Sequence, residues 1–257
     1  MVVRWLEEIG KFLFESCEKV GEVLLLFGQT LRWLFRSPLL ARRTFEQMAE
    51  VGVNSIPVVL ITATFTGMVL ALQSYNGFRR FNAEGLVGTV VALSMTRELG
   101  PVLTGLIVAG RAGSAMAAEL GTMRVTEQID ALYTLAANPV KYLIVPRFLA
   151  GLTVLPALTV IADLVGIFGG YFVAVNVMGA NPSVYIKRTV DFIEPNDIYS
   201  GLLKAAVFGM IISLIGCHQG FYTEGGAEGV GKATTRSVVV SSMLILISDY
   251  FLTALLF

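Results

Sequence analysis

The sequence has few charged residues for its length. Of its 257 residues, 15% are charged and 55% are hydrophobic, whereas soluble domains carry about a quarter charged residues. We therefore expect an integral membrane protein. Basic and acidic residues number 19 each, so no polybasic surface for nucleic acid is implied.

Cysteine and histidine are also scarce. Cys17 and Cys217 lie far apart in the sequence, and His218 is the only histidine. Two thiols and one imidazole make neither a disulfide framework nor a zinc site. The chain also lacks the pattern of a hydrolase triad or of a carboxylate dyad on a soluble scaffold. We therefore expect neither an enzyme nor a protein with a cofactor of its own.

One stretch, residues 226–234, nearly matches the P-loop of nucleotide-binding proteins. Ala233 stands where the magnesium-binding Ser or Thr should be, Glu228 would repel phosphate, and no strand precedes the stretch. We interpret it as a flexible connection. Any ATP and Mg²⁺ should therefore bind to a separate subunit.

The first 40 residues have a pattern of their own. Residues 1–8 carry charges of both signs, unlike a signal peptide, so we expect them to be retained. Apolar residues then recur at steps of three or four, which predicts an amphipathic helix over residues 4–35, lying in the membrane interface. The alternative is a soluble helix packed on a partner. Pro38 is expected to end it.

Five apolar segments follow and predict transmembrane helices. They cover residues 53–75, 86–109, 142–178, 201–221 and 237–257. The third is too long for one upright span, so it should tilt or carry an end outside the membrane. The expected fold is an all-α integral membrane protein, with the N-terminal helix in residues 1–40 and the transmembrane domain in residues 41–257.

The distribution of Lys and Arg predicts the orientation. Residues 1–52 hold seven, residues 110–147 hold four and residues 222–236 hold two, whereas the alternate connections hold two each. Because cytoplasmic loops carry the excess of basic residues, the N-terminus should be cytoplasmic and the C-terminus outside.

Several charged residues lie within the apolar segments: Arg97, Glu98, Asp163, Lys204 and Asp249. Charges in hydrocarbon are costly unless they face a cavity or a partner. Arg97 and Glu98 point about 100° apart on a helix, so they should not neutralise each other, and each should meet a residue on another segment. In one hypothesis the charges line a cavity for an amphiphile's head group, with Lys204 and Arg97 as donors to a phosphate. In the other they form interhelical pairs, for instance Arg97 with Asp249, that lock the bundle.

Small residues are concentrated in the second and third segments: Gly105, Ala109, Gly110, Ala112, Gly113, Ala117, Ala118, Gly166, Gly169 and Gly170. Small residues let membrane helices approach closely, so we interpret them as packing contacts rather than as a catalytic feature. They would also allow two copies of the chain to pack together.

The polar segment from Glu119 to Asp130 follows the second apolar segment. Its charges alternate in sign, and apolar residues lie between them. This pattern predicts a short amphipathic helix outside the bilayer that could dock in a cleft of a cytoplasmic partner. The alternative is a solvated helix with no partner.

Five stretches resemble the signature of the MlaE (YrbE) permease family. They are RELGPV, AGRAGSAMAAELGTM, VTEQIDAL, PVKYLIVPR and the C-terminal ATTRSVVVSSMLILISDYFLTALLF. The resemblance covers about residues 40–257. Members of this family are homodimeric membrane subunits of MCE-type ABC transporters. The related Mla system of Gram-negative bacteria moves phospholipid between the inner membrane and the periplasm and keeps the outer membrane asymmetric.

The resemblance implies roles for particular residues. A coupling helix at about residues 117–135 would contact the ATPase through Glu119, Arg124, Glu127, Gln128 and Asp130. The lipid cavity would be near Arg97, Glu98, Lys204 and Asp249, with Tyr75 and Gln73 near its outer mouth. The implied partners are an MlaF-like ABC ATPase that carries ATP and Mg²⁺, an MlaB-like STAS-type subunit, an MlaD-like periplasmic MCE ring and phospholipid. The implied location is the bacterial inner membrane.

The alternative function is an ion-coupled secondary transporter or channel that uses Arg97, Glu98 and Asp249 as a relay. Such a protein would run on a proton or sodium gradient without ATP, and it would leave the polar segment unexplained. A membrane-embedded lipid enzyme is disfavoured because the sequence lacks a catalytic set based on histidine or a metal.

Overall fold

The structure, a computed structural model, describes residues 2–36 and 40–256. In this part of the chain the helices are α1 (Val2–Leu34), α2 (Ala41–Gly52), α3 (Ile56–Arg79), α4 (Val87–Ser94), α5 (Gly100–Val108), α6 (Ser114–Val125), α7 (Gln128–Thr134), α8 (Val145–Phe172), α9 (Pro182–Phe192), α10 (Pro195–Phe221) and α11 (Gly226–Leu256). Short π-helical segments cover Met95–Leu99, Ala109–Gly113, Val140–Ile144 and Val173–Val177, and a 3₁₀ turn covers Glu84–Leu86. The expected all-helical class is confirmed.

Five of the described helical runs are long and apolar enough to cross a membrane: Ala41–Arg79, Glu84–Val125, Val140–Val177, Pro195–Phe221 and Gly226–Leu256. The predicted number of spans is therefore confirmed for the described residues. A helix rises about 1.5 Å per residue and the hydrocarbon layer is about 30 Å thick. The three longest runs must therefore extend beyond the hydrocarbon, which accounts for the excess length of the third predicted segment.

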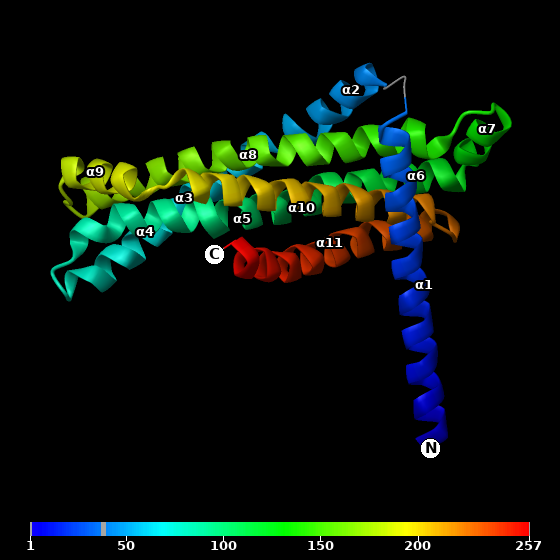
Figure 1. The fold of residues 1–257 in the computed structure, drawn as a ribbon, viewed down its shortest axis with the longest axis horizontal. Coiled ribbons are helices and arrows are strands. Elements are labelled where there is room, and N and C mark those ends of the chain that lie inside the picture. Colours follow the sequence, from blue (N-terminus) through cyan, green and yellow to red (C-terminus); the bar gives the residue numbers. More distant parts are fainter. Residues whose placement is uncertain (1, 37–39, 257) are drawn as a thin grey trace.

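The long helices lie side by side in an elongated bundle, with α6 and α7 at one end and α4 and α9 at the other (Figure 1). Small residues make this packing close. A Cβ atom added at Gly67 of α3 would lie 1.9 Å from the carbonyl oxygen of Gly166 on α8. A Cβ atom added at Gly209 of α10 would likewise lie 2.1 Å from the carbonyl oxygen of Gly151 on α8. The packing role of Gly166 is thus confirmed, whereas a Cβ at Gly110 would meet nothing within 4 Å.

α1 lies across the long axis of the bundle, at the end that holds α6 and α7 (Figure 1). The C-terminal half of α1 contacts the bundle. Leu26 is buried in a cluster with Leu120 of α6 and Ile129 of α7, and Glu22 Oε2 lies 3.2 Å from Nε2 of His218 on α10. Leu25 next to it is 69% exposed. The predicted N-terminal helix exists, and Pro38, its expected terminator, lies outside the described residues.

The segment expected to be a flexible connection is helical instead. α11 begins at Gly226, directly after Gly225, and both glycines have positive φ angles of 66° and 88°, respectively, which form the turn after α10. An ion pair at 2.6 Å between Glu228 and Lys232 lies along the first turns. The interpretation as a flexible connection is therefore wrong. Because residues 226–234 are helical, their main-chain N–H groups do not form the phosphate cradle of a P-loop.

The predicted coupling helix is also not continuous. α6 ends at Val125 and α7 begins at Gln128, because Glu127 has a φ of 59° in the left-handed region. Arg124 Nη1 bridges the resulting corner to Asp130 Oδ1 at 2.7 Å. The expectation of one helix over residues 117–135 is therefore wrong, and the polar segment is a corner between two helices.

Candidate functional site

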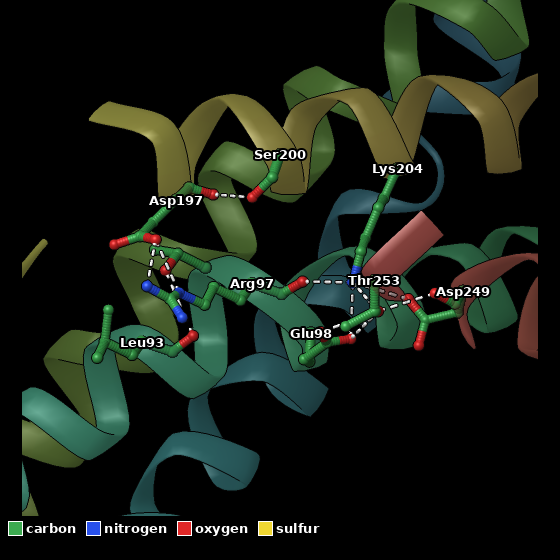
Figure 2. Close-up of polar contacts among 9 residues, drawn as sticks. Leu93, Arg97, Glu98, Asp197, Ser200, Lys204, Asp249 and Thr253 are labelled. Carbon is green, nitrogen blue, oxygen red and sulfur yellow. Dashed lines mark hydrogen bonds and ion pairs between the residues drawn. The ribbon is translucent and has the colours of Figure 1, made fainter. Parts of the chain in front are cut away.

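The charged residues of the second, fourth and fifth spans meet inside the bundle (Figure 2). Arg97 and Glu98 lie in the π-helical turn Met95–Leu99, Lys204 lies on α10 and Asp249 on α11. Pro101 shapes this turn, because it has no N–H to donate to the Arg97 carbonyl four residues earlier. Lys204 Nζ donates a hydrogen bond to that carbonyl at 3.0 Å.

This charge cluster has two halves, and Lys204 is the centre of the larger one. Its side chain is 0% exposed, and its ammonium also donates to Glu98 Oε2 at 2.8 Å and to Thr253 Oγ1 at 2.7 Å. Asp249 Oδ1 lies 3.1 Å from Nζ. A buried ammonium is tolerated in a membrane only with partners of this kind. A phosphate could reach Lys204 only after some of these contacts open.

The smaller half is an ion pair between Arg97 and Asp197. The Arg97 Nε and Nη2 atoms lie 2.7 Å and 2.6 Å from Asp197 Oδ1. The other oxygen, Asp197 Oδ2, accepts from the main-chain N–H of Glu194 at 3.0 Å, which caps the start of α10. Asp197 is therefore fully occupied, and only 1% of its side chain is exposed.

Two sequence predictions can now be compared with this geometry. Arg97 and Glu98 do not pair with each other, and each meets a partner on another segment as predicted, namely Asp197 and Lys204, both on α10. The example pair of Arg97 with Asp249 is wrong, because Arg97 pairs with Asp197 and Asp249 pairs with Lys204.

The cluster has two cations and three carboxylates. In the larger half, the carboxylates are more accessible than the ammonium. Glu98 is 39% exposed and Asp249 is 19% exposed, while Lys204 between them is enclosed. Arg97 is 36% exposed beside its aspartate. The roles of these four residues in lipid binding stay predictions.

The other two residues predicted to bind lipid lie elsewhere, in the last turns of α3. Tyr75 lines a pocket of about 310 Å³ with Glu84, Asn181 and Tyr185. Gln73 is exposed, and a separation of two residues places it about 200° around the helix from Tyr75. Their placement near an outer mouth of a cavity stays a prediction.

Asp163 of α8 faces the same region without joining the cluster. A Cβ atom at Gly100 would lie 1.8 Å from Asp163 Oδ1, so only glycine fits at that position of α5. This oxygen is buried without a hydrogen-bond partner in the part of the chain that the structure describes.

The residues predicted to contact an ATPase gather at the opposite end of the bundle from α4 and α9 (Figure 1). Glu127, Gln128 and Asp130 are exposed at the corner between α6 and α7. Glu119 Oε2 forms an ion pair at 2.7 Å with Arg147 Nη2 of α8. Ile129, buried with Leu120, fixes α7 to the bundle. The role of the corner in coupling stays a prediction.

Sequence reasoning missed two buried charged residues. Asp197 was overlooked because the fourth apolar segment was expected to begin at Gly201, although Glu194 followed by Pro195 and Asp197 is a helix-start signal. Arg147 was counted only as a basic residue of a cytoplasmic connection. Its side chain is 4% exposed, and it joins α8 to α6 through Glu119.

Among the described residues, no group of three or more His, Cys, Asp and Glu side chains is placed to hold a metal ion. Comparison with known proteins bears on the class of the chain. The family model described as Permease MlaE matches residues 44–255. The chain belongs to the MlaE permease family.

Individual relatives agree with this membership of the MlaE family. A probable ABC transporter permease protein of Rickettsia felis is 49% identical over 257 residues, which cover 100% of this chain and 99% of the relative. The intermembrane phospholipid transport system permease protein MlaE of Haemophilus influenzae is 37% identical, with coverage of 100% and 99%. The chloroplastic protein TRIGALACTOSYLDIACYLGLYCEROL 1 of Arabidopsis thaliana is 40% identical, over 91% of this chain and 67% of its own length.

Proposed function

We propose that this protein is the permease subunit of an ABC transporter that moves glycerophospholipids between the inner membrane and the periplasm and so maintains outer-membrane asymmetry. Family membership supports this proposal, as does the phospholipid transport role in the name of the Haemophilus relative. Two copies would enclose the lipid pathway. ATP and Mg²⁺ would bind to a separate cytoplasmic ATPase, assisted by a small STAS-type subunit, and a periplasmic MCE ring would receive or deliver the lipid.

The observation that carries the proposal is the position of the charge cluster on the helical run Glu84–Val125. This run joins Glu98 in the membrane to the corner at Glu127 without a loop. The distance along the helix from Glu98 to Val125 is about 40 Å at 1.5 Å per residue. Force applied by an ATPase at the corner can therefore reach the cluster through a single stiff element.

The chemistry of the cluster suggests what such a movement does. A shift of the second span against α10 would lengthen the contacts from Lys204 to Glu98 and to the Arg97 carbonyl. The uncovered ammonium would then attract a lipid phosphate, and closing of the contacts would expel it. The closed cluster is the state with its charges internally paired, so loading and release would follow the ATPase cycle.

The proposed orientation has the N-terminus and the corner in the cytoplasm and the C-terminus in the periplasm. The excess of Lys and Arg on the N-terminal side of the first span supports it. In this orientation α1, which lies across the bundle, would run parallel to the membrane plane as an interfacial helix.

Reconstitution tests the function directly. Proteoliposomes with the permease, its ATPase and the MCE protein should transfer fluorescent phospholipid when ATP and Mg²⁺ are added. Omission of the ATPase, or an ATPase variant that cannot hydrolyse ATP, should stop the transfer. Transfer at full rate without the ATPase, driven by a proton or sodium gradient, would instead support the ion-coupled alternative.

A further inference from the structure

Two adjoining cavities lie on the side of the bundle formed by α2, α6 and the start of α8. The first is a groove of about 770 Å³ lined by small and apolar residues, among them Val51, Ala112 and Met116, and also by polar residues that include the ion pair of Arg111 with Glu50. The second is a pocket of about 220 Å³ that is lined mainly by polar residues. Gln47, Glu119 and Met123 line both, so the groove and the pocket are continuous.

Two arginines lie in the wall of the polar pocket. Arg147 is buried; its Nη1 donates a hydrogen bond to the Leu143 carbonyl and its Nη2 pairs with Glu119, both at 2.7 Å. Its Nε is buried without a hydrogen-bond partner among the described residues. A buried guanidinium donor without an acceptor is uncommon and needs an explanation. An anion that reached the Nε atom from the pocket would supply one.

Arg43 of α2 also lines the pocket. Its guanidinium donates a hydrogen bond to the Tyr142 hydroxyl and lies 3.6 Å from the centre of the Tyr142 ring. The nearest acid on its own helix, Glu46, pairs instead with Arg42 at 3.1 Å. Two arginines and two glutamates thus line the pocket: Glu119 pairs with Arg147, Glu46 pairs with Arg42, and Arg43 is bound to the neutral Tyr142 hydroxyl.

A groove with small and apolar residues that continues into a pocket with two arginines fits the acyl chain and the phosphate of a glycerophospholipid. We propose that this is a second lipid site, in which the groove takes acyl chain and Arg43 and Arg147 take the phosphate. The inference rests on the proposed function for its substrate class and for placing this end of the bundle at the cytoplasmic leaflet. A free anion would not use the groove, and a lipid without phosphate would not need the arginines.

Photo-crosslinking tests this site. The purified full chain is placed in vesicles of phosphatidylethanolamine and phosphatidylglycerol with a trace of phosphatidylglycerol that carries a diazirine in one acyl chain. After illumination, labelled peptides are mapped by mass spectrometry. We expect label on residues 112–123, and Arg43→Glu should reduce it about tenfold. Arg42→Glu is the matched control, because the Arg42 side chain is 93% exposed and is not among the residues that line the pocket, although its partner Glu46 is.

A second variant tests the site in case Arg43→Glu does not fold. Ala115→Trp fills the exposed groove and leaves both arginines in place, so it should also remove the label. Equal labelling of the Arg43→Glu and Arg42→Glu proteins overturns the inference. Equal labelling by a diazirine diacylglycerol, which has chains but no phosphate, overturns it as well.

The same preparations separate this inference from the proposed function. If the wild-type protein transfers lipid with ATP but Arg43→Glu does not change the labelling of the groove, the second site is refuted and the proposed function stands. Specific labelling of the groove without ATP-driven transfer supports the site and counts against the proposed function.

Discussion

Lys204 on α10 is bound to the main-chain carbonyl of Arg97, at 3.0 Å, rather than to its side chain. The guanidinium of Arg97 points to Asp197 instead. Because a carbonyl is present whatever residue occupies position 97, substitution of Arg97 leaves this contact of Lys204 available. The two halves of the charge cluster can therefore be perturbed separately.

Lys204→Met tests the larger half. The substitution removes the buried ammonium and leaves Glu98 and Asp249 without their cation. Removal of one partner from a buried pair costs about 3–5 kcal/mol, and the partial exposure of Glu98 places the expected loss near the lower figure. The midpoint of thermal unfolding in detergent should fall, and lipid transfer should be lost.

Lys232→Met is the control, because its ion pair with Glu228 is exposed and such pairs contribute less than about 1 kcal/mol. The double variant Lys204→Met with Glu98→Gln should recover part of the lost stability. An unchanged unfolding midpoint for Lys204→Met would show that the ammonium does not hold the spans together.

Asp197 tests the smaller half. Asp197→Asn removes the charge that pairs with Arg97 but keeps an oxygen for the Glu194 N–H, whereas Asp197→Ala removes both. We expect the order of stability wild type, Asn, Ala, with the alanine variant lower than the asparagine variant by about 1 kcal/mol for the lost cap. Equal unfolding midpoints for the two variants would argue against the capping role.

The corner at Glu127 can be tested for its charge and for its backbone. Glu127→Gly keeps the left-handed conformation, which costs a residue other than glycine about 1 kcal/mol, so the variant should be slightly more stable. Glu127→Lys keeps a side chain but reverses its charge. If the ATPase binds here, co-purification should fall about tenfold with Glu127→Lys, equivalent to about 1.4 kcal/mol. Full recovery of the ATPase with that variant would count against coupling at this corner.

Close packing of α3 on α8 gives a further prediction. Gly67→Ala would push a methyl group against the Gly166 carbonyl, so the protein should lose about 1–3 kcal/mol of stability. Gly77→Ala on the same helix is the control, because a Cβ there meets nothing within 4 Å. The control should be neutral or gain up to about 1 kcal/mol from improved helix propensity. Thermal unfolding of both variants in one detergent measures the difference.

Much of the fold follows from hydropathy and angular spacing. Long apolar runs predict the five spans because length alone decides whether a helix can cross the hydrocarbon. That Arg97 and Glu98 pair with other segments rather than with each other follows from the rotation of 100° per residue in a helix. Partner identity does not follow, because it depends on which helices are adjacent, and Asp197 lies 100 positions from Arg97.

The corner and the ends of the helices were harder to predict. Nothing in the residue type of Glu127 marks a left-handed backbone, which normally favours glycine. Gly226 suggested flexibility, yet its positive φ forms a fixed turn at the start of α11. Asn181 before Pro182 does indicate a helix start, and its side chain accepts from Ser183 and Val184 at the start of α9. Hydropathy alone does not predict this helix because it is short and polar.

The π-helical turns Met95–Leu99 and Ala109–Gly113 have a consequence for how the second span tolerates change in length. Each widened turn accommodates one residue more than an α-helical turn does. Deletion of a single residue from Ala109–Gly113 would restore regular winding with little rotation of the helix beyond it, whereas deletion of one residue from α5 would rotate everything beyond it by about 100°. Only the α5 deletion would change the azimuth of Glu119 and Glu127 relative to Glu98. The widened turn is therefore the place where the second span can lose a residue and still transmit a movement from one end to the other in the same direction.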